Sequence, residues 1–283
     1  MELAPFTTFG IGGPAKYFTK AGKPQELAAA FQAAHGFGIR CFILGGGSNI
    51  LFADEGFDGL VVKDECREFA VQENIITAQS GAWLDGLVDV ATENSLAGFE
   101  FAAGIPGTVG GAIYGNAGAF GGCLADILES AVVCDFSGKP KIVGPGYFEF
   151  AYRRSRLKKD FELVLSASFK LRPGEKQRIA DRASEHRQLR RIKHPTEYGC
   201  AGSVFKNIKK PSLMPAGKLL EEAGVRGMKV GGAEVFEKHC NIIVNKRGDA
   251  SAREVKELAD LMKQAAYDNH GIELEYELIA IEP

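Results

Sequence analysis

The chain has 283 residues, is 45% hydrophobic and carries a formal net charge of −2. It is long enough for two or three lobes with sizeable cores, and its charge balance speaks against nucleic acid or anionic lipid as a partner. No apolar run reaches the roughly 18 residues that cross a bilayer, and the N-terminal "MELAPFTTFG" lacks the regions of a secretory signal. We therefore expect a cytoplasmic protein that binds neither membranes nor nucleic acid.

The first half of the sequence predicts helices and strands in mixed order. Residues 23–38 predict a helix, because Pro24 suits its first turn and apolar residues recur at helical spacing. Residues 82–98 predict a second helix with Trp83 on its apolar face and a stop at Gly98. Strands are expected in 39–52, where the strand runs into a glycine turn, in 59–64, in a hairpin around residues 73–74, in a pair joined at residues 137–138, and in 163–171.

The second half has a different texture. A highly charged helix is expected over 178–192 as a connector, and a helix closed by glycine over 216–227. A strand is expected within 239–248, followed by a long amphipathic helix over 249–271 with a capping signal at Asp249 or Ser251. The alternation in 272–282 predicts a closing strand. We predict an α+β protein with an N-terminal half up to about residue 175 and a C-terminal αβ lobe from about residue 193.

Six scattered cysteines form no C-x-x-C pair. In a cytoplasmic protein this pattern favours reduced thiols and speaks against a zinc site or a disulfide framework. We therefore expect no metal site.

Two glycine-rich segments are candidates for a ligand site, "LGGGSNILF" (44–52) and "GIPGTVGGA" (104–112). Glycine adopts positive φ angles and lacks the Cβ that keeps a ligand away from the backbone, and successive exposed N–H groups bind anions. Each segment carries a hydroxyl, on Ser48 or Thr108, so the pair suits the diphosphate of a dinucleotide. Tight turns or close backbone packing remain the alternative. The Rossmann and P-loop fingerprints are both absent.

Several motifs together resemble one family. They are "TTFGIGGPA" (7–15), "LGGGSNILF" (44–52), "GIPGTVGGAIYGNAGAFG" (104–121), "YRRSRLK" (152–158), "AGSVFKN" (201–207), "AGKLLEEAGVRG" (216–227), "GGAEVFEKHCNIIVN" (231–245) and "ELEYELIAIE" (273–282). In order and spacing they resemble the UDP-N-acetylenolpyruvoylglucosamine reductases, the flavoenzymes of bacterial peptidoglycan precursor synthesis. Only about 50 residues separate Arg153 from Ser203, which resembles the shorter type of this family, without the insertion that carries a substrate-clamping tyrosine.

The resemblance implies an FAD-binding fold of the vanillyl-alcohol-oxidase (PCMH) type. Two FAD-binding subdomains would span residues 1–63 and 64–192, and a substrate-binding αβ domain would span 193–283, with its last strand (271–283) returning towards the flavin. The glycine-rich segments would then form cradles on two sides of the cofactor. The implied FAD-binding residues are Gly45, Gly46, Gly47, Ser48, Asn49, Gly104, Ile105, Gly107, Thr108, Gly110, Gly111, Ala112, Asn116, Ala117 and Gly118.

The resemblance also implies a reaction and three catalytic residues. NADPH would reduce FAD, and the flavin would then pass hydride to the enolpyruvyl ether of a UDP-sugar, after which a proton completes the lactyl ether. Ser203 would donate that proton, Arg153 would clamp the substrate carboxylate, and Glu277 would orient that carboxylate or share a proton with it. Taken alone, the residues leave three alternatives open: a turn or capping serine, a solvated strand-end arginine and a solvated strand glutamate.

The substrate contacts are less sharply implied. A capping or core histidine is as good a description of His239, and Lys206 and Asn207 could instead polarise the serine beside them. We expect a monomer. The implied substrate-binding residues are Tyr152, Lys206, Asn207, His239 and Asn241.

The sequence departs from the family in three places. Phe236 stands where serine is usual, Gly199-Cys200 where Pro-Ser is common, and the proline that usually follows Asn207 is delayed. Two other functions remain possible: an FAD-dependent oxidase of the same superfold and a nucleotide-sugar-binding protein without catalysis.

Overall fold

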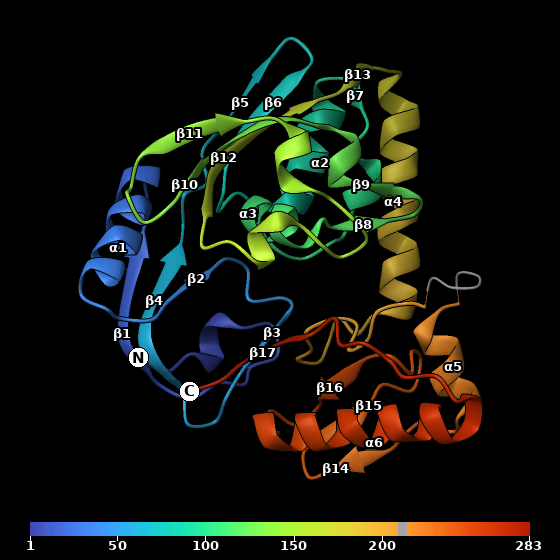
Figure 1. Ribbon diagram of the computed structural model, residues 1–283. Coiled ribbons are helices and arrows are strands. Elements are labelled where there is room, and N and C mark those ends of the chain that lie inside the picture. The colour runs from blue at the N-terminus through green and yellow to red at the C-terminus, as the bar shows by residue number, and fades with distance from the viewer. Residues whose placement is uncertain (209–213) are drawn as a thin grey trace. The chain divides into compact units, whose positions relative to one another are not determined.

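The computed structural model describes residues 1–208 and 214–283 and divides into two compact units (Figure 1). The first unit comprises Met1–Lys16, Gly47–Asp58 and Arg191–Pro283, and the second comprises Tyr17–Gly46 and Gly59–Arg190. Each unit is therefore built from segments that are distant in the sequence. The division into three parts at residues 63 and 192 stays a prediction.

The second unit is built on a five-stranded antiparallel sheet. Both predicted hairpins are confirmed, since β5 pairs with β6 and β10 with β11. Glu73 and Gly138 have φ angles of 52° and 70°, as the tight turns of hairpins often require. The strands lie in the order β11 (Pro140–Val143), β10 (Leu128–Cys134), β12 (Leu163–Lys170), β6 (Ile75–Gln79) and β5 (Phe69–Gln72).

Helices bury both sides of this sheet. Helix α3 (Val109–Gly115) contacts β6 and β12, and α2 (Leu84–Glu93) joins the same core through its apolar face. In that core the rings of Phe99 and Phe169 meet edge to face, with centroids 5.0 Å apart. Helix α1 (Pro24–Gly36) instead packs Leu27 and Phe31 with Leu165 of β12 in a separate cluster. The apolar spacing in the sequence thus correctly predicts α1.

Shorter elements complete this unit. The boundary between the units falls inside two strands, β1 (Ala15–Ala21) and β4 (Phe57–Asp64). Helix α4 (Lys176–Lys193) confirms the predicted charged helix and also crosses the boundary, at residue 190. The remaining strands form the sheet β1 (Ala15–Ala21), β4 (Phe57–Asp64) and β2 (Cys41–Leu44), and the pairs β7 (Leu96–Ala97) with β13 (Arg172–Pro173) and β8 (Gly118–Ala119) with β9 (Gly122–Cys123).

The first unit packs two helices against a small sheet. Helix α6 (Ala252–His270) contacts α5 (Ala216–Glu222) and strands β14 (Lys229–Val230) and β15 (Ala233–Val235), while β16 (Ile243–Asn245) pairs with β15. The predicted cap is at Ser251, whose Oγ accepts a hydrogen bond from the N–H of Glu254 at 3.2 Å. Asp54 also accepts hydrogen bonds from the first two N–H groups of α6, where a carboxylate is favourable. Strand β17 (Ile279–Ile281) pairs in parallel with β3 (Ile50–Phe52).

Two predicted elements are wrong in part. The predicted helix over 82–98 spans only Leu84–Glu93, and Trp83 is its N-cap, 45% exposed, rather than part of the apolar face. The predicted closing strand over 272–282 is a strand only at Ile279–Ile281. Its alternation fails because the N–H groups of Glu277 and Leu278 both bond to the carbonyl of Val204, which breaks the two-residue period.

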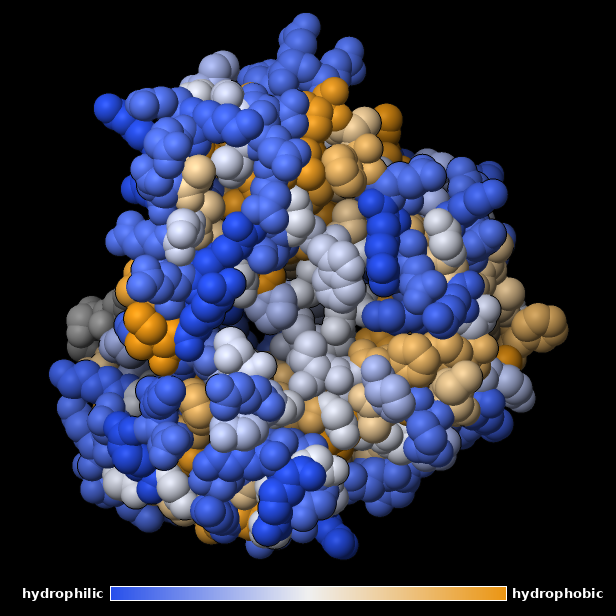
Figure 2. All heavy atoms as spheres, turned by 180° about the vertical axis from the view of Figure 1, so that it is seen from behind, coloured by the Kyte–Doolittle hydropathy of each residue, from blue (hydrophilic) through white to orange (hydrophobic). Residues whose placement is uncertain are grey.

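The described residues show a mainly hydrophilic face, free cysteines and no candidate for a membrane-spanning helix or a metal site. Figure 2 shows that hydrophilic side chains cover much of one face and that hydrophobic residues appear on it in separate patches. Among the described residues, no helix is long and apolar enough to cross a membrane. All six cysteines are free thiols, and residues 1–208 and 214–283 contain no cluster of side chains that could hold a metal ion.

Candidate active site

Gly45 and Gly46, the part of the first glycine-rich segment that belongs to the second unit, pack against the other glycine-rich segment. A Cβ on Gly46 would lie 2.8 Å from the Cα of Gly107, and one on Gly45 would lie 2.5 Å from Oγ1 of Thr108. Real Cβ atoms essentially never lie so close to another heavy atom. The close backbone packing that the sequence left open is therefore observed between Gly46 and Gly107. The packing places Gly45 and Gly46 directly beside the 104–112 segment instead of leaving the two segments apart.

Within residues 104–121 the structure contains helix α3, which the sequence did not predict. Its N–H groups are held at the start of the helix, where Val109 N–H donates to the carbonyl of Ala82 and Gly110 N–H to that of Ser80. Asn116 ends the helix with a φ of 45° and is 6% exposed. Its side chain donates to the carbonyl of Ala151 and accepts from an N–H of the chain that follows α3. The amide of this predicted FAD-binding residue is thus engaged with the protein's own backbone.

Two buried hydroxyls at this junction have no hydrogen-bond partner among the described residues. Ser80 and Thr108 are 1% and 3% exposed, and neither hydroxyl forms a hydrogen bond within the described part of the chain. Leaving a buried polar group unpaired costs about 1–3 kcal/mol, so such a group marks a place where a ligand can contribute to stability. Thr108 was predicted as a ligand hydroxyl and Ser80 was missed. The only sequence signal for Ser80 is a Ser-Gly pair directly after a strand.

Arginine side chains hold both ends of the glycine segment. The Nε of Arg190 on α4 donates to the carbonyl of Gly104 at 2.8 Å, and Nη1 of Arg153 donates to the carbonyl of Gly118 at 3.1 Å. Burial lowers the pKa of Arg190, and the charge of Arg153 lowers it further. Arginine nevertheless stays protonated at neutral pH. Positive charge therefore accompanies the bare backbone, which suits an anionic ligand. Arg190 has no local sequence signal.

Arg153 lies in a tight turn rather than at a strand end. The backbones of Ala151 and Arg154 bond to each other in both directions, and Tyr152 and Arg153 form the turn between them. The φ angle of Arg153 is 54°, a left-handed conformation that is uncommon outside glycine and often marks functional residues. Its guanidinium lies 5.2 Å from the centre of the Tyr152 ring. Both residues are half-buried.

In the first unit, Ser203 is held in an irregular strand-like segment. It forms an isolated β-bridge with Ile242 and follows Gly202, whose φ is +73°. No hydrogen bond of the Ser203 hydroxyl is found to any residue that the structure describes. A capping serine would accept one from a helical N–H, so that alternative finds no support.

The segment that carries Glu277 lies beside the segment of Ser203. The carbonyl of Val204 accepts a hydrogen bond from the N–H of Glu277 at 2.8 Å. The carbonyl of Glu277 in turn accepts one from Nδ2 of Asn49 at 3.2 Å. Two of the three predicted catalytic residues are thus held by directly bonded segments. The side chain of Asn49, predicted to bind FAD, supports Glu277.

The neighbours of Ser203 have structural partners. Nζ of Lys206 pairs with a carboxylate oxygen of Glu275 at 3.0 Å, and Oδ1 of Asn207 accepts from the first N–H of α5, on Ala216. Asn207 therefore caps α5, in addition to any substrate contact. The usual proline after Asn207 is replaced by a later one among residues 209–213, which lie outside the described residues.

His239 and Asn241 support the same region. Nδ1 of His239 accepts a hydrogen bond from the N–H of Asn241 at 3.3 Å, which places the proton of the neutral ring on Nε2. Burial lowers the pKa of His239, so the ring is neutral at physiological pH. Asn241 is 2% exposed, and its amide bonds to the backbone of Phe205.

Two departures from the family pattern have a packing reason. A Cβ at Gly199 would lie 2.5 Å from the carbonyl oxygen of Phe9, so this chain needs glycine there. Phe236 packs in a small buried cluster with Ile242, and Cys200 contacts the same cluster. The aromatic ring and the small residue thus belong to one local packing arrangement.

Comparisons with known proteins show the family. Residues 194–281 match the C-terminal domain of UDP-N-acetylenolpyruvoylglucosamine reductase, and residues 15–143 match an FAD binding domain. The reductase of Moorella thermoacetica is 41% identical over 277 residues, 98% of this chain and 90% of its own length. That of Caldicellulosiruptor bescii is 40% identical over 279 residues, 98% of this chain and 88% of its own length. The chain belongs to the UDP-N-acetylenolpyruvoylglucosamine reductase family.

A solved structure agrees with this assignment. The crystal structure of the reductase from Thermus caldophilus superimposes with a TM-score of 0.85 at 32% identity, covering 99% of this chain and 97% of its own. The predicted α+β fold with an FAD-binding part and a C-terminal reductase domain is confirmed, and so is FAD as the cofactor class.

The second unit of this reductase family member fits FAD. The matched FAD-binding domain, residues 15–143, includes both glycine segments, which provide bare backbone. The hydroxyls of Ser80 and Thr108, which have no partner among the described residues, and the positive charge of Arg190 lie beside this backbone. The remaining predicted contacts divide between the units: Gly47, Ser48 and Asn49 belong to the first. The individual FAD contacts, from Gly45 to Gly118, stay predictions, as do the substrate contacts of Tyr152, Lys206, Asn207, His239 and Asn241.

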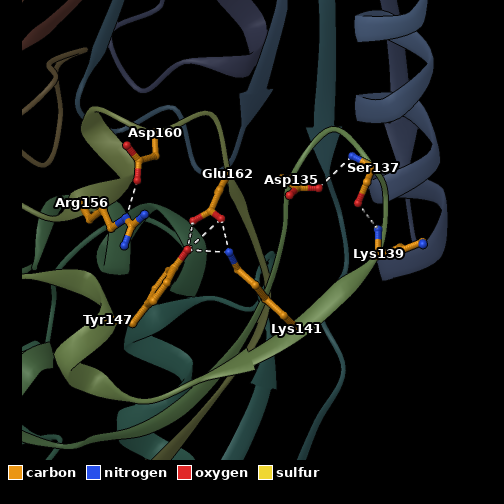
Figure 3. Close-up of polar contacts among 8 residues, drawn as sticks. All are labelled: Asp135, Ser137, Lys139, Lys141, Tyr147, Arg156, Asp160 and Glu162. Carbon is orange, nitrogen blue, oxygen red and sulfur yellow. Dashed lines mark hydrogen bonds and ion pairs between the residues drawn. The ribbon is translucent and has the colours of Figure 1, made fainter.

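Figure 3 shows a further polar cluster in the second unit, in which Lys141, Tyr147 and Glu162 bond to one another. The hydroxyl of Tyr147 donates to Glu162, whose side chain is 9% exposed, and Lys141 bonds to both. The guanidinium of Arg156 lies 4.5 Å from the centre of the Tyr147 ring. The hydrogen bonds to Glu162 and Tyr147 raise the pKa of Lys141. Because its groups satisfy one another, this cluster ties β11 to the segment before β12 and is a structural feature.

Proposed function

We propose that the protein reduces the enolpyruvyl ether of UDP-N-acetylglucosamine enolpyruvate to the lactyl ether of UDP-N-acetylmuramate, with NADPH as the electron source. The relatives that match 98% of this chain carry the name of this reductase. Within the structure, the observation that carries the proposal is the bond from Glu277 N–H to Val204 O, next to Ser203. It places the predicted proton donor and the predicted carboxylate partner on adjacent segments.

Bound FAD supplies the transfer of hydride from NADPH to the vinyl group of the substrate. The residues of the chain have to handle the charge and the proton that this transfer requires. Negative charge develops on the substrate carboxylate, and the guanidinium of Arg153 stabilises it through a bidentate contact. The strained turn holds that side chain close to the end of the glycine segment.

Ser203 donates the proton that completes the lactyl ether. A serine hydroxyl is a weak acid, so the transfer depends on its position relative to the substrate and on nearby charge. The absence of a protein partner for this hydroxyl in the described residues is what a donor to a substrate requires. Glu277 orients the substrate carboxylate or shares a proton with it. Tyr152, Lys206, Asn207 and His239 contact the UDP-sugar, and the protein acts as a cytoplasmic monomer.

The test is an anaerobic absorbance spectrum of the purified holoprotein. NADPH should bleach the visible flavin band, and the enolpyruvyl UDP-sugar should restore it. Ser203→Ala should spare the bleaching and slow the restoration by about 10²-fold or more, since general acid catalysis contributes about 10²–10⁴-fold. The control is Ser168→Ala, which removes a hydroxyl that pairs with Thr77 at an exposed site on β12.

Three results would contradict the proposal. A protein that takes up no FAD would remove the cofactor and the mechanism together. A flavin that returns only with air would indicate an oxidase. A protein that binds the UDP-sugar but never reoxidises with it would indicate a binding protein without this reaction.

A further inference from the structure

Asn241 lies beside the segment that carries Ser203, and both polar atoms of its side chain form hydrogen bonds to it. Oδ1 accepts from the N–H of Phe205 at 2.9 Å, and Nδ2 donates to the carbonyl of Phe205 at 2.8 Å. The backbone carbonyl of Asn241 accepts from the N–H of Val204 at 2.9 Å. One residue thus makes three hydrogen bonds to the two residues that follow Ser203.

The other edge of the same segment carries the bonds to Glu277. The carbonyl of Val204 accepts from the N–H groups of Glu277 and Leu278 at 2.8 and 3.2 Å, and the N–H of Lys206 donates to the carbonyl of Glu275 at 2.8 Å. Residues 203–206 therefore lie between residues 241–242 and residues 275–278. The pairing on both sides consists of isolated bridges, Ser203 with Ile242 and Phe205 with Tyr276, not of a continuous sheet.

A regular sheet would fix the register of these segments through its repeated backbone bonds. Here the primary amide of Asn241 takes the place of a backbone peptide group and pairs with both polar groups of Phe205. Because Asn241 is 2% exposed and Phe205 is fully buried, water cannot replace these bonds, and hydrogen bonds in such surroundings are stronger than in water.

We propose that Asn241, in place of the substrate contact expected from the sequence, is a positioning residue for the reductive reaction, which fixes Ser203 relative to Glu277. This rests on the proposed function, in which Ser203 donates the proton. Removing the amide would let residues 203–206 shift while the glycine segments of the second unit stay intact. Asn241 would then affect the proton-donating half of the cycle and spare the reduction of the flavin by NADPH.

Asn245 provides a matched control on the same stretch of chain. It is 4% exposed, and its amide also makes two hydrogen bonds to backbone groups, the carbonyl of Phe9 and the N–H of Ala250. Neither partner lies in residues 203–206 or 275–278. Asn245→Ala therefore removes a buried amide of the same kind without releasing the Ser203 segment.

The experiment measures both half-reactions of the holoenzyme by anaerobic stopped-flow absorbance. Asn241→Ala should lower the limiting rate of flavin reoxidation by the enolpyruvyl UDP-sugar about 10- to 100-fold, as expected for a misplacement near 1 Å. The rate of bleaching by NADPH should stay within about twofold, and Asn245→Ala should stay within about twofold in both steps. In a Ser203→Ala background, adding Asn241→Ala should change the reoxidation rate less than about threefold, because the two residues act as a unit.

Several outcomes would overturn the proposal. Equal losses in Asn241→Ala and Asn245→Ala, or equal losses in both half-reactions, would show a general structural role. A raised dissociation constant for the UDP-sugar with an unchanged limiting rate would show a substrate contact. If Asn241→Ala does not fold, Asn241→Asp keeps the acceptor and the size while removing the donor to Phe205, and the same readouts apply. A wild-type flavin that the UDP-sugar never reoxidises would instead overturn the proposed function, whatever the variants do.

Discussion

The glycine segment of the second unit and the Ser203 segment of the first unit fix their backbones by opposite means. At Gly45, Gly46 and Gly107 two segments of the backbone come close together because the glycines have no Cβ between them. Around Ser203 the backbone is irregular, and the side-chain amide of Asn241 holds it through two hydrogen bonds to Phe205. The first arrangement should therefore fail when atoms are added, and the second when atoms are removed.

The largest effect is expected from an added atom in the glycine segment. Gly46→Ala would place a Cβ 2.8 Å from the Cα of Gly107 and 3.1 Å from the ring of Trp83. The backbone contact cannot be relieved by a rotamer change, so we expect a loss of about 1–3 kcal/mol in the free energy of unfolding and weaker FAD binding. Chemical denaturation and a flavin fluorescence titration measure the two effects.

Gly115→Ala is the matched control for this substitution. A Cβ at Gly115 would have no atom within 4 Å, and the residue ends α3. Alanine there should be neutral or stabilise the protein by up to about 1 kcal/mol. Equal denaturation midpoints for the two variants would show that the glycine segment is not sensitive to an added Cβ at Gly46.

Removing the hydroxyl of Thr108 should change the stability of the apoprotein and its affinity for FAD in opposite directions. Thr108→Val keeps the shape of the side chain and removes a buried oxygen that has no partner in the described residues. The apoprotein should become more stable by about 1 kcal/mol, while its affinity for FAD should fall by about tenfold. Thermal melting of the apoprotein and titration with FAD are the two measurements.

Thr77→Val serves as the control here, because the hydroxyl of Thr77 pairs with Ser168 at 2.8 Å at an exposed position. It should change neither property by a comparable amount. An apoprotein that melts at a lower temperature after Thr108→Val would show that this oxygen already has a favourable environment without FAD. The hydroxyl would then serve the packing of the glycine segment and not the binding of the cofactor.

The sequence predicts the position of the glycine-rich site better than its backbone conformation. The glycine segments were found because their composition is unusual, and Thr108 because it lies inside one of them. Helix α3 was missed because three of its seven residues are glycine, which has a low helix propensity. Composition thus predicts where the backbone is bare but not the conformation that it adopts.

Contacts between distant residues could not be predicted. Arg190 reaches Gly104 across 86 positions and Asn241 reaches Phe205 across 36, and neither residue has a local signal for its partner. The alternation in 272–282 predicted a regular strand, yet two successive N–H groups share the Val204 carbonyl. The resemblance supplied Ser203 and Glu277, and only the structure shows the bonds that join their segments.

The smallest expected effect is a pH dependence centred on His239. Burial lowers the pKa of this ring in the folded state, whereas the unfolded chain has a value near the ordinary one of about 6.5. Above about pH 6.5 both states are neutral and the residue contributes nothing. Between this value and the folded pKa the unfolded state binds the proton, so the protein should lose stability as the pH falls. In His239→Gln this loss should be absent, so the difference between the two melting temperatures should stay constant above about pH 6.5 and change as the pH is lowered below this value. Because Nδ1 of His239 also holds the N–H of Asn241, the wild-type rate of flavin reoxidation by the UDP-sugar should fall as this ring is protonated. A difference in melting temperature that stays constant below about pH 6.5 as well would show that His239 has the same pKa in both states and that its burial does not restrain the Asn241 segment.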